Sequence, residues 1–309
     1  MSNKNKVVVI LGPTASGKTS FGVKLAKKFN GEIISADSRQ VYRGMDIGTG
    51  KDLDEYTIKS KGKIIKIPYH LIDVVSPRTE FNLAKYKKLA IRAIDDILKR
   101  EKLPIIVGGT GLYLETIVEN YELCPVKPNK TLRAQLEKLN TSELLARLKA
   151  LNHKFYQKLN SSDKKNRRRL IRYIEILSYD PQFKPRKRSP KYESLLLGVT
   201  WSRETLKQRI YKRLIERIEK EGMIEEVERL HKEGISWKRL ISFGLEYKYI
   251  SLYLKGELNR EEMIEKLYQA ICQFAKKQMT WFRRWERKGA KIYWINDIKK
   301  MEKLVQDFL

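Results

Sequence analysis

The stretch "VVVILGPTASGKTS" (residues 7–20) decides the fold class of this 309-residue chain. Its first five residues are apolar and mostly β-branched, which is typical of a strand buried in a parallel sheet. Residues 12–19 fit the pattern G-x-x-x-x-G-K-[ST] and precede a segment with helical character that runs to Phe29. Between a strand and a helix, this pattern indicates a loop that holds phosphate on backbone N–H groups and on the helix N-terminus.

The chemistry expected of this loop follows from its last residues. Lys18 neutralises the outer phosphate, and the hydroxyl of Thr19 binds Mg²⁺. The predicted diphosphate-binding residues are Gly12, Thr14, Ala15, Ser16, Gly17, Lys18 and Thr19. The loop alone does not say what the diphosphate is attached to.

The acidic residue that usually accompanies such a loop has only weak candidates here. In "IIVGG" (residues 105–109) a glycine stands where a strand would normally end in aspartate, and Asp73 in "HLID" follows only two apolar residues. This weakens the interpretation of the chain as an ordinary ATPase or kinase without excluding it.

The order of expected elements predicts an α/β protein with a core like that of P-loop NTPases, a parallel sheet with helices on both faces. Strands and helices alternate up to about residue 120, and a strand returns in "ESLLLGVTW", followed by a helix that Ser202 caps. We expect a core of residues 1–118 and 196–309, interrupted by a mostly helical, basic insertion of residues 119–195. The helices expected in the insertion span residues 129–139, 141–151 and 162–178, and a Pro-rich basic loop follows at 179–191.

The charge of the chain points to a polyanionic partner. Lys and Arg number 65 against 37 Asp and Glu, and residues 153–191 alone carry thirteen against three. In "DKKNRRRLIRYIEIL" (residues 163–177), Arg168 and Arg172 are four residues apart and share a side of the expected helix. This concentration favours binding to a phosphate backbone, and the alternative is a solvated helix face.

Other compositional features narrow the class of protein. Cys124 and Cys272 are far apart, and the three histidines are scattered, so we expect neither a zinc site nor a disulfide framework. No apolar run approaches the length of a membrane span. These observations predict a soluble protein of the cytoplasm.

Asp37 is the candidate for acid–base chemistry. It follows the expected strand "GEIIS", and the carboxyl ends of parallel strands line the ligand crevice of open α/β sheets. There it can act as general base or bind a metal through water, whereas an isolated Asp would more often cap a turn. The neighbours Ser38, Arg39 and Gln40 favour a site. Thr110, in the glycine turn "GGTG", can reach the same crevice, and a plain strand–helix turn is an equally good interpretation of that stretch.

Taken in order, these segments resemble the tRNA dimethylallyltransferase (isopentenyltransferase) family. The resemblance covers about residues 6–294, and its most specific part is "ISADSRQVYRGMDIGTGK". The other segments that carry it are "GPTASGKT", "YHLIDVVSP", "PIIVGGTGLYL", "NRRRLIRYIEI", "RIEKEGMIEEVERL", "FGLEY" and "AKKQMTWFRRW". The family often reads "GTAKP" and "IGY" where this chain has "GTGKD" (residues 48–52) and "FGL" (residues 243–245).

The resemblance implies a reaction and a role for particular residues. Members of the family transfer a dimethylallyl group from its diphosphate to the exocyclic N6 amine of the adenosine immediately 3′ of the anticodon, and diphosphate leaves. The implied catalytic residues are Asp37 as base, Thr110 at the substrate and Arg209 on the diphosphate side. The implied tRNA contacts are Asp37, Ser38, Arg39, Gln40, Arg133, Arg168, Arg169, Leu170, Ile171 and Arg172.

The implied partners are dimethylallyl diphosphate and the anticodon stem-loop of tRNA, with Mg²⁺ as cofactor, and we expect a monomer that does not bind membranes. Three alternatives stay open at this point. An adenylate-type isopentenyltransferase would use free nucleotide and would need no RNA-binding face. A P-loop small-molecule kinase would use residues 120–195 as a lid. A non-catalytic RNA-binding protein would need neither Asp37 nor Thr110.

Overall fold

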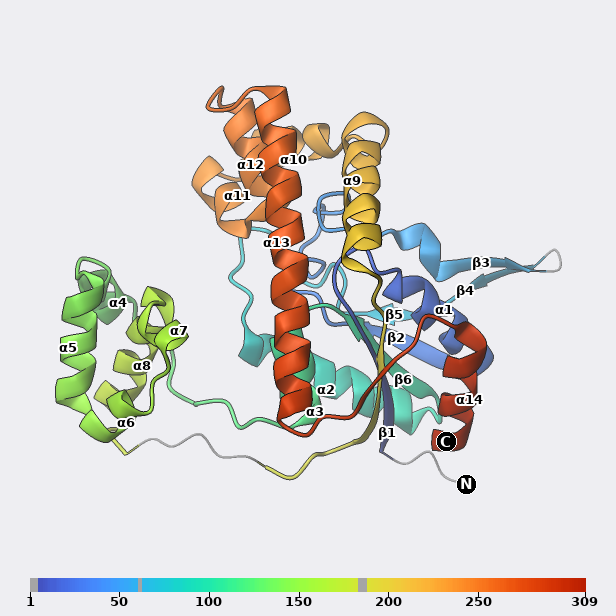
Figure 1. Cartoon of the computed structure of the whole chain (residues 1–309), viewed down its shortest axis with the longest axis horizontal. Helices are drawn as coiled ribbons and strands as arrows, with labels where there is room; N and C mark the ends of the chain where they lie inside the picture. Colours follow the sequence, from blue (N-terminus) through green and yellow to red (C-terminus); the bar gives the residue numbers. More distant parts are fainter. Residues whose placement is uncertain (1–4, 61–62, 183–187) are drawn as a thin grey trace. The chain divides into compact units, whose positions relative to one another are not determined.

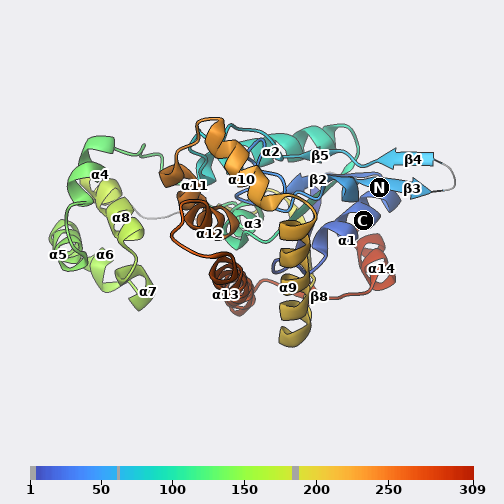
Figure 2. The ribbon, with the colours of Figure 1, turned by 90° about the horizontal axis from the view of Figure 1, so that it is seen from above.

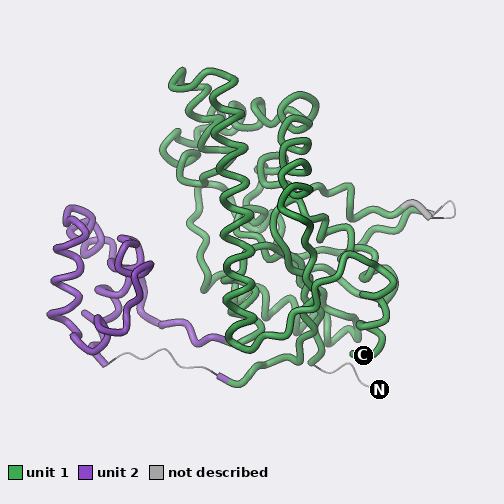
Figure 3. Tube along the Cα trace, in the orientation of Figure 1, with its two compact units in different colours: residues 1–120, 189–309 green, residues 121–188 purple. Residues whose placement is uncertain are grey.

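The structure is a computed structural model that describes residues 5–60, 63–182 and 188–309. The chain divides into two compact units, which Figure 3 shows in different colours. Unit 1 consists of residues 1–120 and 189–309, and unit 2 of residues 121–188. The last residues of the range 119–195, where we expected the insertion, belong to the sheet of unit 1, because its strand β7 begins at Glu193.

A six-stranded sheet lies at the centre of unit 1, in the order β5-β2-β6-β1-β7-β8. All neighbouring strands pair in parallel. The apolar strand of the opening stretch, β1, lies between β6 and β7, with Val8 opposite Ile105 and Leu195. The strands are β1 Lys6–Leu11, β2 Gly31–Ser35, β5 Tyr69–His70, β6 Leu103–Gly108, β7 Glu193–Gly198 and β8 Ile292–Trp294.

Helices cover both faces of this sheet, as Figures 1 and 2 show. Val7 and Val9 of β1 pack in one apolar cluster with α2 (Leu83–Lys99) and α3 (Gly111–Val118). Val8 and Ile10 point the other way and pack with α1 (Lys18–Lys28) and α14 (Ile298–Phe308). The alternation along one strand therefore builds two cores, and the α/β class expected from the sequence is confirmed.

A second group of helices in unit 1 packs around its own apolar core, which also takes in Val41, Tyr42 and Met45 from the segment after β2. The helices are α9 Arg203–Glu219, α10 Met223–Lys232, α11 Trp237–Phe243, α12 Leu245–Leu254 and α13 Arg260–Arg287. The side chain of Ser202 caps α9, as expected, by accepting a hydrogen bond from Thr205 N at 3.1 Å.

The 28-residue helix α13 joins this helical group to the sheet (Figure 1). Met263 and Leu267 in its first half pack in the helical group, whereas Phe282 and Trp285 near its end pack against the sheet. Its middle therefore lies beside the carboxyl ends of the strands. The remaining elements of unit 1 are η1 Leu53–Tyr56 and the antiparallel hairpin of β3 Thr57–Ser60 and β4 Lys63–Lys66.

Unit 2 is helical in all the residues that the structure assigns to regular elements. Its helices are α4 Lys130–Leu136, α5 Thr141–Leu151, α6 His153–Gln157, α7 Ser161–Lys164 and α8 Arg167–Tyr179. The helix expected over residues 162–178 is divided in two, because the side chain of Asn166 caps α8 by accepting from Arg169 N at 3.2 Å. The expected basic loop at 179–191 lies partly outside the described residues, at 183–187.

Across the ranges that the structure describes, no helix has both the length and the apolar character needed to cross a membrane.

Candidate active site

A cavity of about 290 Å³ in unit 1 lies where strands β1, β2 and β6 end. The phosphate loop and residues of the segment after β2 both line it. Nine of the residues predicted from the sequence line this cavity: Thr14, Ala15, Gly17, Lys18, Thr19, Asp37, Ser38, Arg39 and Gln40. The phosphate loop, expected to hold the donor, and residues 37–40, expected to hold the acceptor, thus line the same cavity.

The cavity contains half-buried positive charge. Burial lowers the pKa of Lys18 to about 8, in spite of the nearby Asp37. Burial, together with the neighbouring Arg217, lowers the pKa of the Arg213 guanidinium to about 10. Both cations line the cavity. A charged group whose pKa is lowered by desolvation is stabilised by a counter-ion, so this site is suited to a polyanion.

Thr14 is held from two sides. Its backbone N–H donates to Oε1 of Gln278 on α13 at 2.8 Å, and its hydroxyl accepts from Nη2 of Arg213 on α9 at 2.5 Å. The backbone N–H of Thr14 is therefore occupied by a side chain. Lys18 folds back on the same loop, with its ammonium 3.3 Å from the carbonyl oxygen of Pro13.

Three arginines one helical turn apart on α9 have different surroundings. Arg209, the arginine expected on the diphosphate side, donates from Nε to the carbonyl oxygen of Ala15 at 2.8 Å and does not line the cavity. Arg213 and Arg217 do line it. Nη2 of Arg217 donates to both carboxylate oxygens of Asp52, at 2.8 and 3.0 Å. Arg209 thus supports the phosphate loop, and the two arginines further along the helix face the cavity.

Asp37 both caps a turn and faces the cavity. Its Oδ1 accepts from the backbone N–H of Arg39 at 2.7 Å and of Gln40 at 3.4 Å. Among the described residues, no hydrogen bond reaches its other carboxylate oxygen, Oδ2. The structural and chemical interpretations of Asp37 are therefore compatible, since one oxygen serves the turn and the other is available to accept a proton.

Thr110 ties the glycine turn after β6 to the Asp37 segment. Its hydroxyl accepts from the backbone N–H of Ser38 at 3.2 Å, and its own N–H donates to the carbonyl oxygen of Ala36 at 3.2 Å. Thr110 does not itself line the cavity. Of the other predicted loop residues, Gly12 and Ser16 are buried beneath the loop and also do not line it.

The segment of residues 46–50 is positioned by a buried carboxylate that the sequence analysis did not identify. Glu226 on α10 accepts from the N–H groups of Asp46, Ile47 and Gly48 at 2.7, 2.8 and 3.1 Å. The hydroxyl of Tyr247 donates to it at 2.7 Å. The only signal in the sequence is that Glu226 lies on the apolar side of its helix, between Met223 and Leu230.

Apolar side chains from the second helical group also reach the cavity. They are Phe243, Leu245, Ile271 and Phe274. Phe243, Leu245 and Ile271 belong to the same apolar cluster as Ala15 of the phosphate loop. The cavity therefore combines a polyanion-binding side with an apolar wall, which suits a diphosphate attached to a small hydrocarbon group.

The residues of the site fit Mg²⁺ only in combination with a phosphorylated ligand. Within the described part of the chain, no group of three or more His, Cys, Asp or Glu is placed to hold a metal. Thr19 and Asp37 line one cavity. Mg²⁺ is usually bound by one or two protein groups together with substrate phosphates, and this pair satisfies that requirement.

The two candidates for the missing acidic companion are both explained by local geometry. A Cβ on Gly108 would lie 2.3 Å from the carbonyl oxygen of Ala36, so this position has no room for a carboxylate. Asp73 instead pairs at 2.5 Å with the buried ammonium of Lys51, and it does not line the cavity.

In unit 2, two of the arginines expected to contact tRNA are bound to a buried carboxylate. Arg133 donates to both oxygens of Glu175 at 2.7 Å. Arg172 donates to Glu175 at 3.2 Å and to the carbonyl oxygen of Val126 at 2.6 Å. Burial alone would raise the pKa of Glu175. The hydrogen bonds that Glu175 accepts, that from Arg133 foremost, outweigh the burial, so its pKa is lowered overall. These arginines hold unit 2 together.

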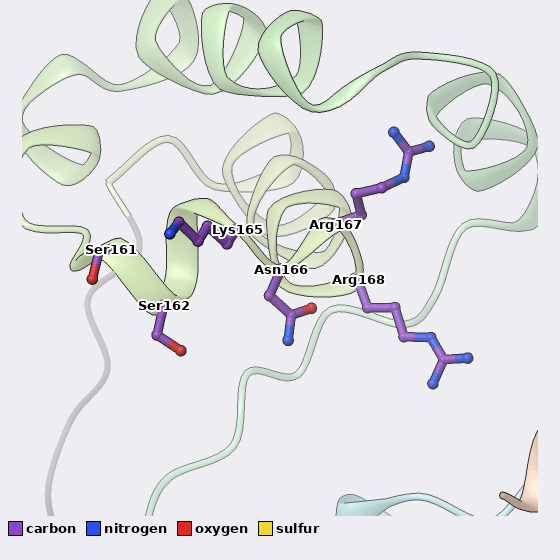
Figure 4. Close-up of a pocket in the computed structure, with 6 residues that line it drawn as sticks. All are labelled: Ser161, Ser162, Lys165, Asn166, Arg167 and Arg168. Atoms are coloured by element: carbon purple, nitrogen blue, oxygen red, sulfur yellow. The ribbon is translucent and has the colours of Figure 1, made fainter. Parts of the chain in front are cut away.

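The remaining predicted contacts of unit 2 differ in exposure. Leu170 and Ile171 pack in its apolar core. Arg169 pairs with Asp163 at 2.7 Å. Arg168 is exposed and forms no hydrogen bond or ion pair with another described residue, and Figure 4 shows its side chain extending away from the start of α8. Lys165 extends in the opposite direction from the same turn (Figure 4).

Comparisons with known proteins agree with this arrangement. The family model described as IPP transferase matches residues 40–285, and the model described as isopentenyl transferase matches residues 5–65. The chain is 48% identical over 301 residues to tRNA dimethylallyltransferase 2 of Treponema denticola, covering 96% of this chain and 97% of that protein. It is 49% identical over 289 residues to tRNA dimethylallyltransferase 1 of Geotalea uraniireducens, covering 94% and 92%.

Solved structures are similar over most of the chain. The full-length tRNA isopentenylpyrophosphate transferase of Bacillus halodurans superposes with a TM-score of 0.69 at 34% identity, covering 99% of this chain and 95% of that one. A eukaryotic dimethylallyltransferase acting on tRNA superposes with a TM-score of 0.72 at 26% identity, covering 90% and 70%. With a phosphate loop, a polyanion cavity and these relatives over nearly its full length, the chain belongs to the IPP transferase family, the family of the tRNA dimethylallyltransferases.

Proposed function

We propose that this protein transfers a dimethylallyl group from dimethylallyl diphosphate to the exocyclic N6 amine of the adenosine 3′-adjacent to the anticodon of tRNA. The observation that carries the proposal is the single cavity lined by Lys18 and Arg213 on one side, Asp37 on another and an apolar wall from α11 to α13. The names of the relatives supply the dimethylallyl group and tRNA as its acceptor, and the family resemblance of the sequence implies the diphosphate donor and the adenosine N6 amine.

On the donor side, the bond between the allylic carbon and the diphosphate oxygen breaks, and negative charge builds on the diphosphate. Lys18 and Arg213 line the cavity and are desolvated, so their attraction to this charge is stronger than it would be in water. The wall of Phe243, Leu245, Ile271 and Phe274 is the apolar surface on which the five-carbon group lies.

On the acceptor side, the N6 amine forms the new bond to the allylic carbon and must lose a proton. Asp37 accepts that proton on Oδ2, since its Oδ1 is occupied by the turn of residues 37–40. The proton then passes to solvent, and diphosphate leaves. Ser38, Arg39 and Gln40, beside Asp37, face the adenosine and its neighbours.

Mg²⁺ fits this scheme as a cofactor that Thr19 and Asp37 would hold together with the diphosphate. When bound, it supplies positive charge to the leaving group. Lys18 and Arg213 supply the remaining positive charge. Thr14 stays fixed between Gln278 and Arg213.

For the tRNA, exposed basic side chains of unit 2 such as Lys165 and Arg168 bind the phosphate backbone. We propose a monomer, because residues of one chain line the cavity, and a reducing compartment such as the cytoplasm, because Cys124 and Cys272 are both free. Size-exclusion chromatography with light scattering tests the monomer, and a dimer that dissociates only with loss of activity would contradict it.

The proposal is tested by incubating the protein with Mg²⁺, dimethylallyl diphosphate labelled in its hydrocarbon part, and one of three acceptors: unmodified tRNA, adenosine monophosphate or a small-molecule alcohol with ATP. We expect label in tRNA, with one diphosphate released for each group transferred. Label in the free nucleotide would instead identify an adenylate-type enzyme, and phosphorylation of the alcohol would identify a kinase.

A further inference from the structure

Gln278 is a buried amide that bridges two loops of the candidate active site. It lies in the middle of α13 with 6% of its surface exposed. Its Oε1 accepts from the backbone N–H of Thr14 at 2.8 Å, and its Nε2 donates to the carbonyl oxygen of Gly109 at 3.0 Å. One side chain thus joins the phosphate loop after β1 to the glycine turn after β6.

Gly109 is placed for this contact. A Cβ on Gly109 would lie 2.2 Å from Nε2 of Gln278, so only glycine allows the backbone to approach the amide this closely. A substitution at Gly109 would push against Gln278 from the other side. The bridge therefore depends on both residues, and each provides an independent way to disturb it.

Hydrogen bonds also join the glycine turn after β6 to the segment around Asp37. Ala36 donates its N–H to the carbonyl oxygen of Val107 at 2.8 Å and accepts at its own carbonyl from the N–H of Thr110 at 3.2 Å. The hydroxyl of Thr110 accepts from the N–H of Ser38 at 3.2 Å. A continuous series of hydrogen bonds thus runs from the phosphate loop through Gln278 to the residues on either side of Asp37.

We propose that Gln278 is a positioning residue that sets the distance between the diphosphate of the donor and the base Asp37. The inference rests on the proposed function and adds to it a residue that lines the same cavity but whose amide oxygen and nitrogen are both bonded to the backbone of the two loops. Attack on an allylic carbon requires the amine, the carbon and the leaving oxygen to be aligned, and the two loops that Gln278 joins hold the two ends of that line.

This role predicts a particular kind of defect. If the bridge is lost, both substrates still bind, because Lys18 and Arg213 hold the donor and unit 2 holds the RNA. The allylic carbon is then no longer aligned with the amine. Some donor molecules react with water instead, giving dimethylallyl alcohol and diphosphate, so diphosphate release exceeds transfer to tRNA.

Three variants and one control separate this role from a purely structural one. Gln278→Met keeps the length of the side chain and removes both hydrogen bonds. Gln278→Glu keeps the acceptor for Thr14 but turns a second oxygen toward the carbonyl of Gly109. Gly109→Ala displaces the amide without changing it. The control is Gln269→Met on the same helix, since the Gln269 side chain is exposed and bonds only Glu265 among the described residues, at 3.1 Å.

For each protein, single-turnover transfer to tRNA, diphosphate release, and the dissociation constants of inorganic diphosphate and tRNA are measured. We expect all three bridge variants to transfer about 10- to 100-fold more slowly, with dissociation constants within about threefold of the parent, because a displacement of about 1 Å has effects of that size. Their ratio of diphosphate released to groups transferred rises above one, and the control behaves like the parent.

Two results would overturn the proposal. One is transfer at the parental rate by Gln278→Met with a ratio of one. The other is a loss of transfer that matches a loss of diphosphate binding while the ratio stays at one, since Gln278 would then only support the loop. Transfer by the parent protein in the same assay tests the proposed function separately, so the two failures are distinguishable.

Discussion

Arg213 donates a hydrogen bond to the hydroxyl of Thr14 at 2.5 Å, and this places a half-buried guanidinium on the phosphate loop. Arg209, four residues earlier on α9, bonds the carbonyl oxygen of Ala15 and lies outside the cavity. The two arginines differ in role although they share a helix and a spacing. We therefore expect Arg213 to act on the ligand and Arg209 to support the loop.

The first prediction compares these two positions. Arg213→Gln removes a charge from the cavity and should weaken the binding of inorganic diphosphate about 10- to 100-fold, since hydrogen bonds to charged groups contribute about 1.5–3 kcal/mol. Arg209→Gln should weaken it less, because Arg209 does not line the cavity. Calorimetric titration of both variants in Mg²⁺ buffer measures this. A larger loss in Arg209→Gln than in Arg213→Gln would reverse the assignment.

The second prediction concerns pH. The pKa of Lys18 is lowered to about 8 by burial, so its ammonium is charged at pH 7 and largely neutral at pH 9. The affinity for diphosphate should therefore fall as pH rises through 8, by up to about tenfold per pH unit, and binding above pH 8 should take up a proton. Because diphosphate itself titrates, the parent is compared with Lys18→Met at each pH. Parallel pH profiles of the two proteins would show that Lys18 does not supply this charge.

The third prediction separates the two uses of Asp37. In Asp37→Asn, the amide oxygen can still accept from the N–H groups of Arg39 and Gln40, so the turn is kept while the base is lost. We expect single-turnover transfer to slow about 10²- to 10⁴-fold, the usual range for a general base, while the binding of diphosphate measured without Mg²⁺ stays unchanged. Asp37→Ala should lose the turn as well and bind tRNA more weakly. If Asp37→Asn transfers at the parental rate, the carboxylate serves only the turn.

The fourth prediction divides the basic residues of unit 2. Replacing the exposed Lys165 and Arg168 by Gln should raise the KM for tRNA and reduce the slope of its logarithm against the logarithm of salt concentration by about two, while the KM for dimethylallyl diphosphate stays constant. Steady-state kinetics at several salt concentrations measure this. An unchanged salt slope would show that the tRNA backbone does not contact these side chains.

Arg172→Gln is the matched contrast for this double variant. It leaves the buried Glu175 with fewer partners, so it should destabilise unit 2 rather than change only the salt slope. Thermal unfolding of the two variants separates the effects. A change of slope in Arg172→Gln without loss of stability would return Arg172 to the RNA-binding surface.

Much of the fold follows from local patterns in the sequence. The apolar run before Gly12, the loop itself and the helix after it predict the β1–loop–α1 unit, and the structure has it. Ser202 is recognisable as a cap because a long helix-forming segment follows it, with Glu204 in its first turn. The order of strands and helices then leaves few topologies for a parallel sheet.

The prediction of helices from apolar spacing was wrong where a polar residue divides the expected helix in two. Residues 162–178 read as one helix, because Leu170, Ile174 and Leu177 keep the apolar spacing. Asn166 divides it, since its side chain accepts from a backbone N–H that a continuous helix would bond internally. The free energies of the capped and the continuous helix differ by only about 1 kcal/mol, and the spacing of apolar residues does not reveal such a difference.

The candidate site was predicted only in the parts that lie near one another in the sequence. Residues 12–19 and 37–40 each form a recognisable segment. Gln278 reaches Thr14 across 264 residues, and Arg213 reaches it across 199. Their roles depend on how α9 and α13 pack against the sheet, so no sequence pattern distinguishes them from other polar residues of these helices.

The central claim is that the phosphate loop holds the diphosphate of the prenyl donor and that the reacting carbon faces Asp37. The most direct measurement is a crystal structure with Mg²⁺ and dimethylallyl thiolodiphosphate, an analogue that keeps its leaving group. We expect the two phosphates against Lys18 and Arg213, the hydrocarbon against Phe243 and Leu245, and the allylic carbon toward Asp37. A nucleotide analogue seated in the loop in preference to this one, or a donor turned with its hydrocarbon away from Asp37, would contradict the account.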